Sequence, residues 1–306
     1  MILVIAGILA SAGLGAAFEH RWRERTIPVT DRAIQLLLYV LMPFVTFFSL
    51  ARLDLGSGVG LGLLVGWIEL LVVGGIGWLV ATRLLGLDRA GAGTLTICCL
   101  LANTGYLGVP LNAALLGHDA IGPAIAWDVA ISGPMLFVFG FGIAAACGTK
   151  AGETARERVR AFLTRNPPLL ALVAGLVAPD VLAPDILVTI AHDAAIALLP
   201  VGFFVLGVHL AREQDEGVVR FPPPLTRPIG AIIGLRLVAA PVLFGVLALT
   251  LADVPDAYRL QAAMPCGINA LIAAHTYGLD LRMAASAVAW TTGLAVAASG
   301  VAGVVT

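Results

Sequence analysis

The sequence predicts an all-α protein that crosses a membrane many times. Of the 306 residues, 59% are hydrophobic and only 12% are charged, whereas charged residues make up about 25% of an ordinary soluble domain. The apolar residues are also grouped in runs of about 20, the length that a helix needs to cross roughly 30 Å of hydrocarbon. A soluble fold of this size could not cover its surface with so few charges, so that class is excluded.

Ten apolar runs predict ten membrane-spanning helices. They lie at residues 1–18, 33–51, 61–82, 91–116, 120–147, 166–182, 186–211, 228–251, 258–277 and 282–305. The first run has no Lys or Arg before it, which favours a retained helix over a cleaved secretory signal. Longer connections are expected at 19–32, 148–165 and 212–227, the last of which contains three consecutive prolines and cannot continue a helix. Little chain remains for a soluble domain, so a fused enzyme or receptor module is excluded.

Positive charges are unevenly divided between the two sides that ten spans would define. The connections on one side carry 15 Lys and Arg residues, whereas those on the other side carry only Arg52 and Arg259. Cytoplasmic loops are enriched in Lys and Arg. We therefore expect residues 148–165 to be cytoplasmic and both termini to lie outside, with the plasma membrane as the surrounding bilayer. The net charge of −1 and the lack of a basic tract give no indication of nucleic-acid binding.

The first and second sets of five helices resemble each other in the order of their motifs. The second and seventh helices each place phenylalanines after a proline, Pro43 and Pro200, and the fifth and tenth each contain an Ala-Trp pair. Because five is odd, the second set would be inverted across the membrane, which is typical of secondary transporters. We expect a first repeat at 1–147, a cytoplasmic linker at 148–165 and an inverted second repeat at 166–306.

The fourth and ninth predicted helices are interrupted by proline, glycine and asparagine. Proline removes a backbone donor and glycine permits non-helical geometry. Each unpaired backbone group costs several kcal/mol in hydrocarbon, so a break persists only where protein, water or a solute satisfies it. Corresponding breaks in two halves indicate a substrate site. The candidate substrate-binding residues are Asn103, Thr104, Gly105, Tyr106, Pro110, Asn112, Pro265, Cys266, Gly267 and Asn269.

The breaks indicate the chemistry of the ligand. Each would leave a half-helix N-terminus with free amide donors and a positive dipole end, and two such ends at the midplane suit a small anion, especially a carboxylate. Asn103, Asn112 and Asn269 would add neutral donors and acceptors. The alternative is a pair of proline kinks whose asparagines only tie helices together.

Several motifs resemble those of the auxin efflux carrier family. The run from Asn103 to Leu111, NTGYLGVPL, resembles the motif in that family's fourth helix. Further matches follow in order over nearly the whole chain, at residues 41–43, 166–169, 263–270, 277–280 and 284–287. The resemblance implies ten helices, a crossing of the broken fourth and ninth helices as in bile-acid symporters and NhaA, and elevator-type exchange between outward and inward states.

The resemblance also implies roles for residues and helices. It assigns substrate contact to Asn103 and crossover roles to Pro110 and Pro265. It implies a scaffold of helices 1, 2, 6 and 7, which supports a homodimer, and a transport domain of helices 3–5 and 8–10. Plant members export auxin, and bacterial members are associated with small carboxylates such as malonate and malate. This chain lacks the long central loop of plant members, has Asn269 where theirs is apolar, and has Cys266 where many bacterial relatives have proline.

Glu69, Arg236 and Asp128 are charged residues inside predicted helices. Glu69 and Arg236 occupy equivalent positions in the two repeats, and because a lone charge in a span costs a few kcal/mol, we expect them to lie close together behind the crossover. They would form a structural lock, or a coupling site where Glu69 takes up a proton or senses a cation. Asp128 would line the transport path or cap a polar cavity.

These observations favour a secondary transporter of a small organic anion, coupled to protons or to sodium or uncoupled. The alternative is a sodium-coupled symporter of the bile-acid transporter type, which needs an oxygen cluster for sodium. A third class, a membrane receptor or an intramembrane enzyme, lacks a signalling domain or a catalytic motif. No His, Asp or Glu cluster has ligand spacing, so neither a metal site nor a cofactor is expected.

Overall fold

The structure is a computed structural model of the chain, and it is built almost entirely from helices. Within the residues that it describes, the extended pairing is limited to an isolated antiparallel bridge between Ala102 and Cys266. The predicted all-α class is therefore confirmed. The predicted linker 148–165 falls mostly outside the described residues, which are 2–53, 57–149, 154, 156–157, 160, 167–215, 217, 222–250 and 254–305.

The helices are those of a multi-pass membrane protein. In the described part of the chain, five helical stretches are long and apolar enough to cross a bilayer, and they coincide with the third, fifth, seventh, eighth and tenth predicted helices. Shorter apolar helices, Tyr39–Leu50 and Pro167–Val177, correspond to the second and sixth. The five long stretches are Gly58–Leu84, His118–Cys147, Asp185–Arg212, Arg227–Leu249 and Leu281–Ser299.

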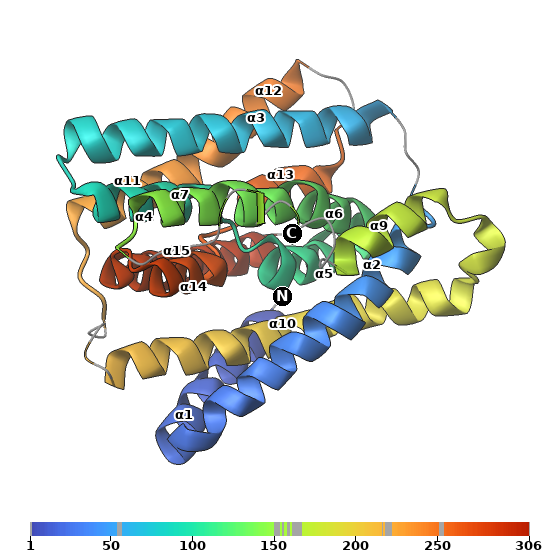
Figure 1. Cartoon of the computed structure of the whole chain (residues 1–306). Helices are drawn as coiled ribbons and strands as arrows, with labels where there is room; N and C mark the ends of the chain where they lie inside the picture. Colours follow the sequence, from blue (N-terminus) through green and yellow to red (C-terminus); the bar gives the residue numbers. More distant parts are fainter. Residues whose placement is uncertain are drawn as a thin grey trace.

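The N-terminal helix continues through the region expected to be a loop. α1 (Ile2–Leu36) includes residues 19–32 and changes direction at Trp22, whose φ of −135° and ψ of 42° are not helical. The two arms that meet at this kink are visible in Figure 1. The prediction of a loop was wrong because the arginines of this region are good helix formers, and polarity alone does not end a helix.

The helices that follow α1 are mostly short, and several are joined by π-helical segments (η1, η2, η3, η5, η6 and η8) or by 3₁₀ turns (η4 and η7). The first half continues with η1 (Leu37–Leu41), α2 (Met42–Leu50), α3 (Ser57–Leu79), η2 (Val80–Leu84), α4 (Arg89–Leu100), η3 (Thr104–Gly108), α5 (Val109–Leu116), η4 (His118–Ala120), α6 (Ile121–Trp127), η5 (Asp128–Ser132), η6 (Met135–Gly140) and α7 (Phe141–Cys147). The second half contains α9 (Pro167–Val177), η7 (Asp180–Leu182), α10 (Asp185–Asp215), α11 (Arg227–Gly234), η8 (Leu235–Ala239), α12 (Ala240–Leu249), α13 (Asp256–Ala262), α14 (Ile268–Tyr277) and α15 (Leu281–Val305).

The helices pack as two neighbouring groups. α10 runs along α1 and α2, and α2 packs against α9, so these helices form one group along the lower and right-hand parts of Figure 1. In the second group, α3 packs on α4 and α12, and α15 packs on α4, α11 and α14. The groups meet at η3, α5 and α6, because η3 and α5 contact α10 while α6 contacts α2.

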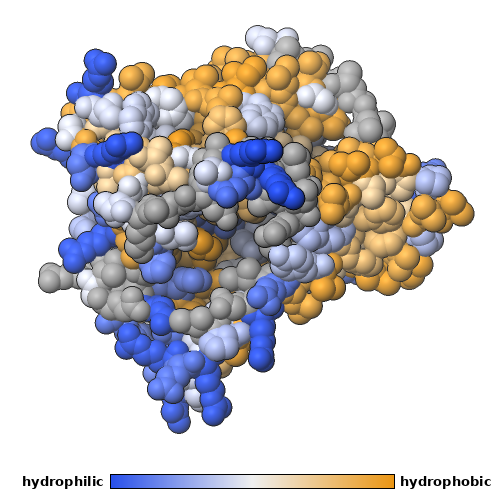
Figure 2. Space-filling view, in the orientation of Figure 1, coloured by the Kyte–Doolittle hydropathy of each residue, from blue (hydrophilic) through white to orange (hydrophobic). Residues whose placement is uncertain are grey.

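Apolar side chains cover much of the outer surface. Figure 2 shows hydrophobic residues over the part of the molecule occupied by α3 and α12 and over the α9 end, whereas hydrophilic residues gather toward the end where α1 kinks. Lipid tails can cover such a surface and water cannot do so without cost. Exposed large apolar residues of α3 and α12 include Leu64, Ile68, Leu71, Leu79, Val242, Val246 and Leu249.

Candidate functional site

The fourth predicted helix is interrupted. α4 ends at Leu100, and Leu101 has an extended backbone with φ of −94° and ψ of 94°. Helical structure resumes at Thr104, in the π-helical η3. Pro110 lies in α5, which continues η3 without a break, because the Val109 amide donates to Thr104 O. The break therefore lies at residues 101–103, and Pro110 is in helical structure after it.

The ninth predicted helix is interrupted as well, and the two interruptions pair with each other. α13 ends at Ala262 and α14 begins at Ile268. Asn103 N donates to Pro265 O at 2.8 Å, and Gly267 N donates to Leu101 O at 2.6 Å. Together with the Ala102–Cys266 bridge, these bonds satisfy backbone groups that hydrocarbon would leave unpaired.

Two half-helices begin on either side of this pairing, at Thr104 and at Ile268. The first amide groups of a helix have no partner inside it, and they carry the positive end of the helix dipole. A cavity of about 130 Å³ lies beside both ends. It is lined by Met42, Leu101, Ala102, Asn103, Thr104, Gly105, Tyr106, Asp128, Val129, Ser132, Gly133, Leu136, Phe137, Pro168, Gly267, Ile268 and Asn269.

The sequence-predicted site residues fall into two sets, those that line the cavity and those that do not. Asn103, Thr104, Gly105, Tyr106, Gly267 and Asn269 line it, as does Asp128. The structure places Pro110, Asn112, Pro265 and Cys266 outside the lining.

The residues outside the lining have contacts with the protein that explain their positions. Asn112 is fully buried, and its Nδ2 donates to Gly108 O at 2.8 Å. The Cys266 amide donates to Thr291 Oγ1 at 3.1 Å. Pro265 accepts from the Asn103 amide through its carbonyl oxygen. These residues therefore hold the broken segments in place, and a solute in the cavity would meet their neighbours.

Asp128 is bound to neutral hydroxyl groups at the cavity wall. Thr104 Oγ1 donates to Asp128 Oδ1 at 2.5 Å and lies 2.8 Å from Ser132 Oγ. The sequence interpretation did not select Ser132. Its position four residues after Asp128 would have indicated it, because side chains at this spacing share one face of a helix.

Gln261 is a second residue that sequence reasoning missed. It lies in the last turn of α13 and is fully buried. Its Nε2 donates to Ala124 O at 2.9 Å and to Thr104 O at 3.3 Å. Gln261 thus ties α6 to the start of η3 and supports the half-helix end at the cavity. It is the sole glutamine of the ninth apolar run, which was the available signal.

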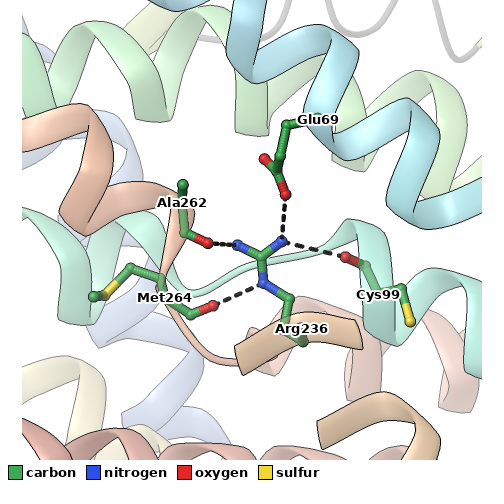
Figure 3. A network of polar contacts seen from close by, with 5 residues as sticks. All are labelled: Glu69, Cys99, Arg236, Ala262 and Met264. Atoms are coloured by element: carbon green, nitrogen blue, oxygen red, sulfur yellow. Dashed lines mark hydrogen bonds and ion pairs between the residues drawn. The ribbon is translucent and has the colours of Figure 1, made fainter. Parts of the chain in front are cut away.

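Glu69 and Arg236 lie together outside the cavity lining (Figure 3). Arg236 Nη1 is 3.4 Å from Glu69 Oε1, and both side chains are completely buried. Arg236 also donates to backbone oxygens at the ends of two half-helices: Nε to Met264 O and Nη2 to Ala262 O at 2.8 Å each, and Nη1 to Cys99 O at 3.5 Å. Carbonyl groups at helix C-termini lack hydrogen-bond donors inside the helix. The guanidinium group of Arg236 provides these donors.

The described residues contain no group of three or more His, Cys, Asp or Glu side chains that could hold a metal ion. The four cysteines are buried and free. Within these residues, the chemistry of the cavity therefore comes from backbone amides, neutral side chains and one carboxyl group.

Two comparisons with known proteins bear on this site. The family model described as membrane transport protein matches residues 159–300, which include the second interruption. A protein of Methanothermobacter thermautotrophicus named as an uncharacterized transporter is 28% identical over 269 residues, which are 84% of this chain and 83% of that relative. The chain is thus similar to a transporter across most of its length.

Proposed function

We propose that the chain is a secondary transporter of a small organic anion and a member of the membrane transport protein family, in agreement with its resemblance to auxin efflux carriers. The observation that carries this proposal is the cavity flanked by the N-termini of η3 and α14. Two positive dipole ends beside one space favour a negatively charged solute.

The lining indicates how the anion is held. Carboxylate oxygens would accept from the free amides of the two half-helices, while Asn103 and Asn269 supply neutral polar groups. No Lys or Arg is among the lining residues that the structure describes. The cavity wall also contains apolar side chains, Met42, Leu136 and Phe137, which would contact the apolar part of the substrate.

We further propose that the chain contains ten membrane helices, arranged as inverted repeats at 1–147 and 166–306 with a cytoplasmic linker at 148–165. The first helix group, α1, α2, α9 and α10, is the scaffold, and α3–α7 with α11–α15 form the transport domain. Met42 of α2 and Pro168 of α9 line the cavity together with η3 and α14 residues. A substrate at this boundary is carried across when the transport domain slides along the scaffold, as in an elevator.

Gly202 of α10 supports sliding at this boundary. A Cβ atom on Gly202 would lie 2.6 Å from Tyr106 Cβ, so a larger side chain would push against η3. Gly202→Val should therefore slow transport more than it weakens substrate binding. Equal loss of both would contradict a role in movement.

The plasma membrane location and the external termini rest on the uneven distribution of Lys and Arg. A homodimer through the scaffold rests on the family resemblance. We also propose that Glu69 and Arg236 form a structural lock, because every donor nitrogen of Arg236 is already engaged by Glu69 or by a backbone oxygen of the broken segments.

Flux into proteoliposomes tests the proposed function. Purified protein would be reconstituted, and uptake of radiolabelled malonate, malate and an indole carboxylate would be measured with and without sodium and proton gradients. We expect saturable uptake of at least one carboxylate and none of a neutral analogue of the same shape. Protein-dependent uptake of none of the three carboxylates would contradict the proposal.

A sodium-coupled symporter of the bile-acid transporter type is the second candidate. Asp128, Thr104 and Ser132 bring three side-chain oxygens together at the cavity. Hard cations prefer such ligands. This candidate predicts that uptake depends on a sodium gradient.

A further inference from the structure

Asp128 is the sole charged side chain among the described residues that line the cavity, and Tyr106 is the other titratable one. The carboxyl group of Asp128 lies directly against the first turn of η3. A Cβ atom on Gly105 would be 3.1 Å from Asp128 Oδ2. The proposed anion and this acid would therefore share one small space.

The elements packed against η5 offer Asp128 no cation of their own. They are η3, α3, α6, α9 and η6. Among them, η3 contributes Tyr106 and α3 contributes Glu69, which is paired with Arg236; α6, α9 and η6 contain no titratable residue. Asp128 accepts its hydrogen bond from the neutral hydroxyl group of Thr104.

An ionised Asp128 would oppose the entry of a carboxylate. Two negative charges repel strongly when little water lies between them, and the dipole ends that attract the substrate would be partly neutralised by the acid. Addition of one proton to Asp128 removes this repulsion. The bound state of the anion therefore requires the neutral acid.

The oxygens of Asp128, Thr104 and Ser132 form a chain of hydrogen bonds. Thr104 has one hydroxyl proton, so when it donates to Asp128 at 2.5 Å it accepts from Ser132 at 2.8 Å. These separations are ordinary for O–H···O hydrogen bonds.

We propose that Asp128 carries one proton across the membrane with each substrate anion. This inference rests on the proposed function, and it states that anion transport is coupled to proton transport. A proton from water on the loading side forms the O–H bond of Asp128, the anion then binds, and on the other side the anion leaves and the proton returns to water. No covalent bond of the substrate changes. A monovalent anion moves without net charge.

The test uses the full-length protein in sodium-free proteoliposomes. With acid outside and equal carboxylate concentrations on both sides, the wild type should accumulate the carboxylate, and a pH-sensitive dye inside should report proton entry only when substrate is added. Above the titration midpoint, the apparent KM should rise about tenfold for each pH unit. Asp128→Asn should lose accumulation and flatten the pH profile, whereas Asp128→Glu should restore a pH-dependent profile.

Glu69→Gln is the matched control, because Glu69 lies outside the cavity and the substitution should leave the pH dependence in place. If the internal pH of wild-type proteoliposomes did not change when substrate is added, the inference would be overturned, even if the Asp128 variants do not fold. Accumulation driven by sodium in place of protons, or an unchanged pH profile in Asp128→Asn, would overturn it as well. In each of these outcomes carboxylate flux persists, whereas failure of the proposed function would abolish the flux itself.

Discussion

Glu69 and Asp128 are both acids inside membrane-spanning helices, but their surroundings differ in every respect that matters for function. Glu69 is completely buried and faces the guanidinium group of Arg236. Asp128 borders a cavity and is bound by the hydroxyl of Thr104. One acid has a fixed cationic partner and no route to solute, while the other has neutral partners and open space beside it.

The position of a charge within the membrane therefore decides its use. Arg236 donates hydrogen bonds to backbone oxygens of both broken helices. Glu69 balances the positive charge that Arg236 brings into the interior. A change of charge on Glu69 would disturb the support of the crossover. A change of charge on Asp128 would alter the cavity and leave that support intact.

The largest effect is expected from Arg236→Met. It leaves Glu69 buried without its ion-pair partner and removes the donors to Ala262 and Met264. Loss of one member of a buried pair costs about 3–5 kcal/mol. Thermal unfolding in detergent should therefore show a large loss of stability. A wild-type unfolding temperature would refute the structural role of this pair.

Glu69→Gln should have a smaller effect, because Arg236 keeps its backbone partners at 2.8 Å. We expect a stability loss of about 1–3 kcal/mol, the range for an imperfectly satisfied buried group. The same unfolding assay measures it. A loss as large as that of Arg236→Met would mean that the charge of Glu69, and not the backbone contacts of Arg236, dominates this region.

Asn103→Ala tests the cavity itself. The side chain lines the cavity, and loss of one hydrogen bond to a bound carboxylate costs about 1 kcal/mol or slightly more. Substrate affinity should fall about five- to tenfold while the unfolding temperature changes little. Asn112→Ala is the matched control, since Asn112 is buried outside the lining. Equal affinity loss in both variants would remove Asn103 from the site.

The smallest effect is expected from Ser132→Ala. Ser132 reaches Asp128 through Thr104, so its loss weakens the arrangement of the acid and leaves the acid in place. Uptake in acid conditions should fall about two- to fivefold, consistent with a net hydrogen-bond contribution of about 0.5–1 kcal/mol. The pH dependence should persist. Its disappearance would transfer the coupling role from Asp128 to the hydroxyl cluster.

Local sequence predicted the parts of the site whose physical cause is local. Asn103, Gly105 and Gly267 were selected because polar and helix-breaking residues stood out in apolar runs, and all three line the cavity. Pro110 was less informative, since helical structure runs through it from η3 into α5 and the break lies before Thr104. Ser132 and Gln261 were missed because a single hydroxyl or amide in an apolar helix is common, so the spacing of Ser132 from Asp128 and the lone glutamine of its run are weak signals.

The order of residues along the chain was enough to establish that this protein is helical, that it lies in a membrane and that two of its helices are interrupted. These properties follow from hydropathy and from the backbone chemistry of proline and glycine, which act over a few residues. The cost of a lone charge in a span predicted the Glu69–Arg236 pair, but the other polar contacts became known only from the packed fold. The Leu101–Gly267 bond, the Thr104 hydroxyl on Asp128 and the contacts of Arg236 join segments distant in the chain. Their meeting depends on how the helices pack, because the residues in one of these segments do not specify their partners in the other.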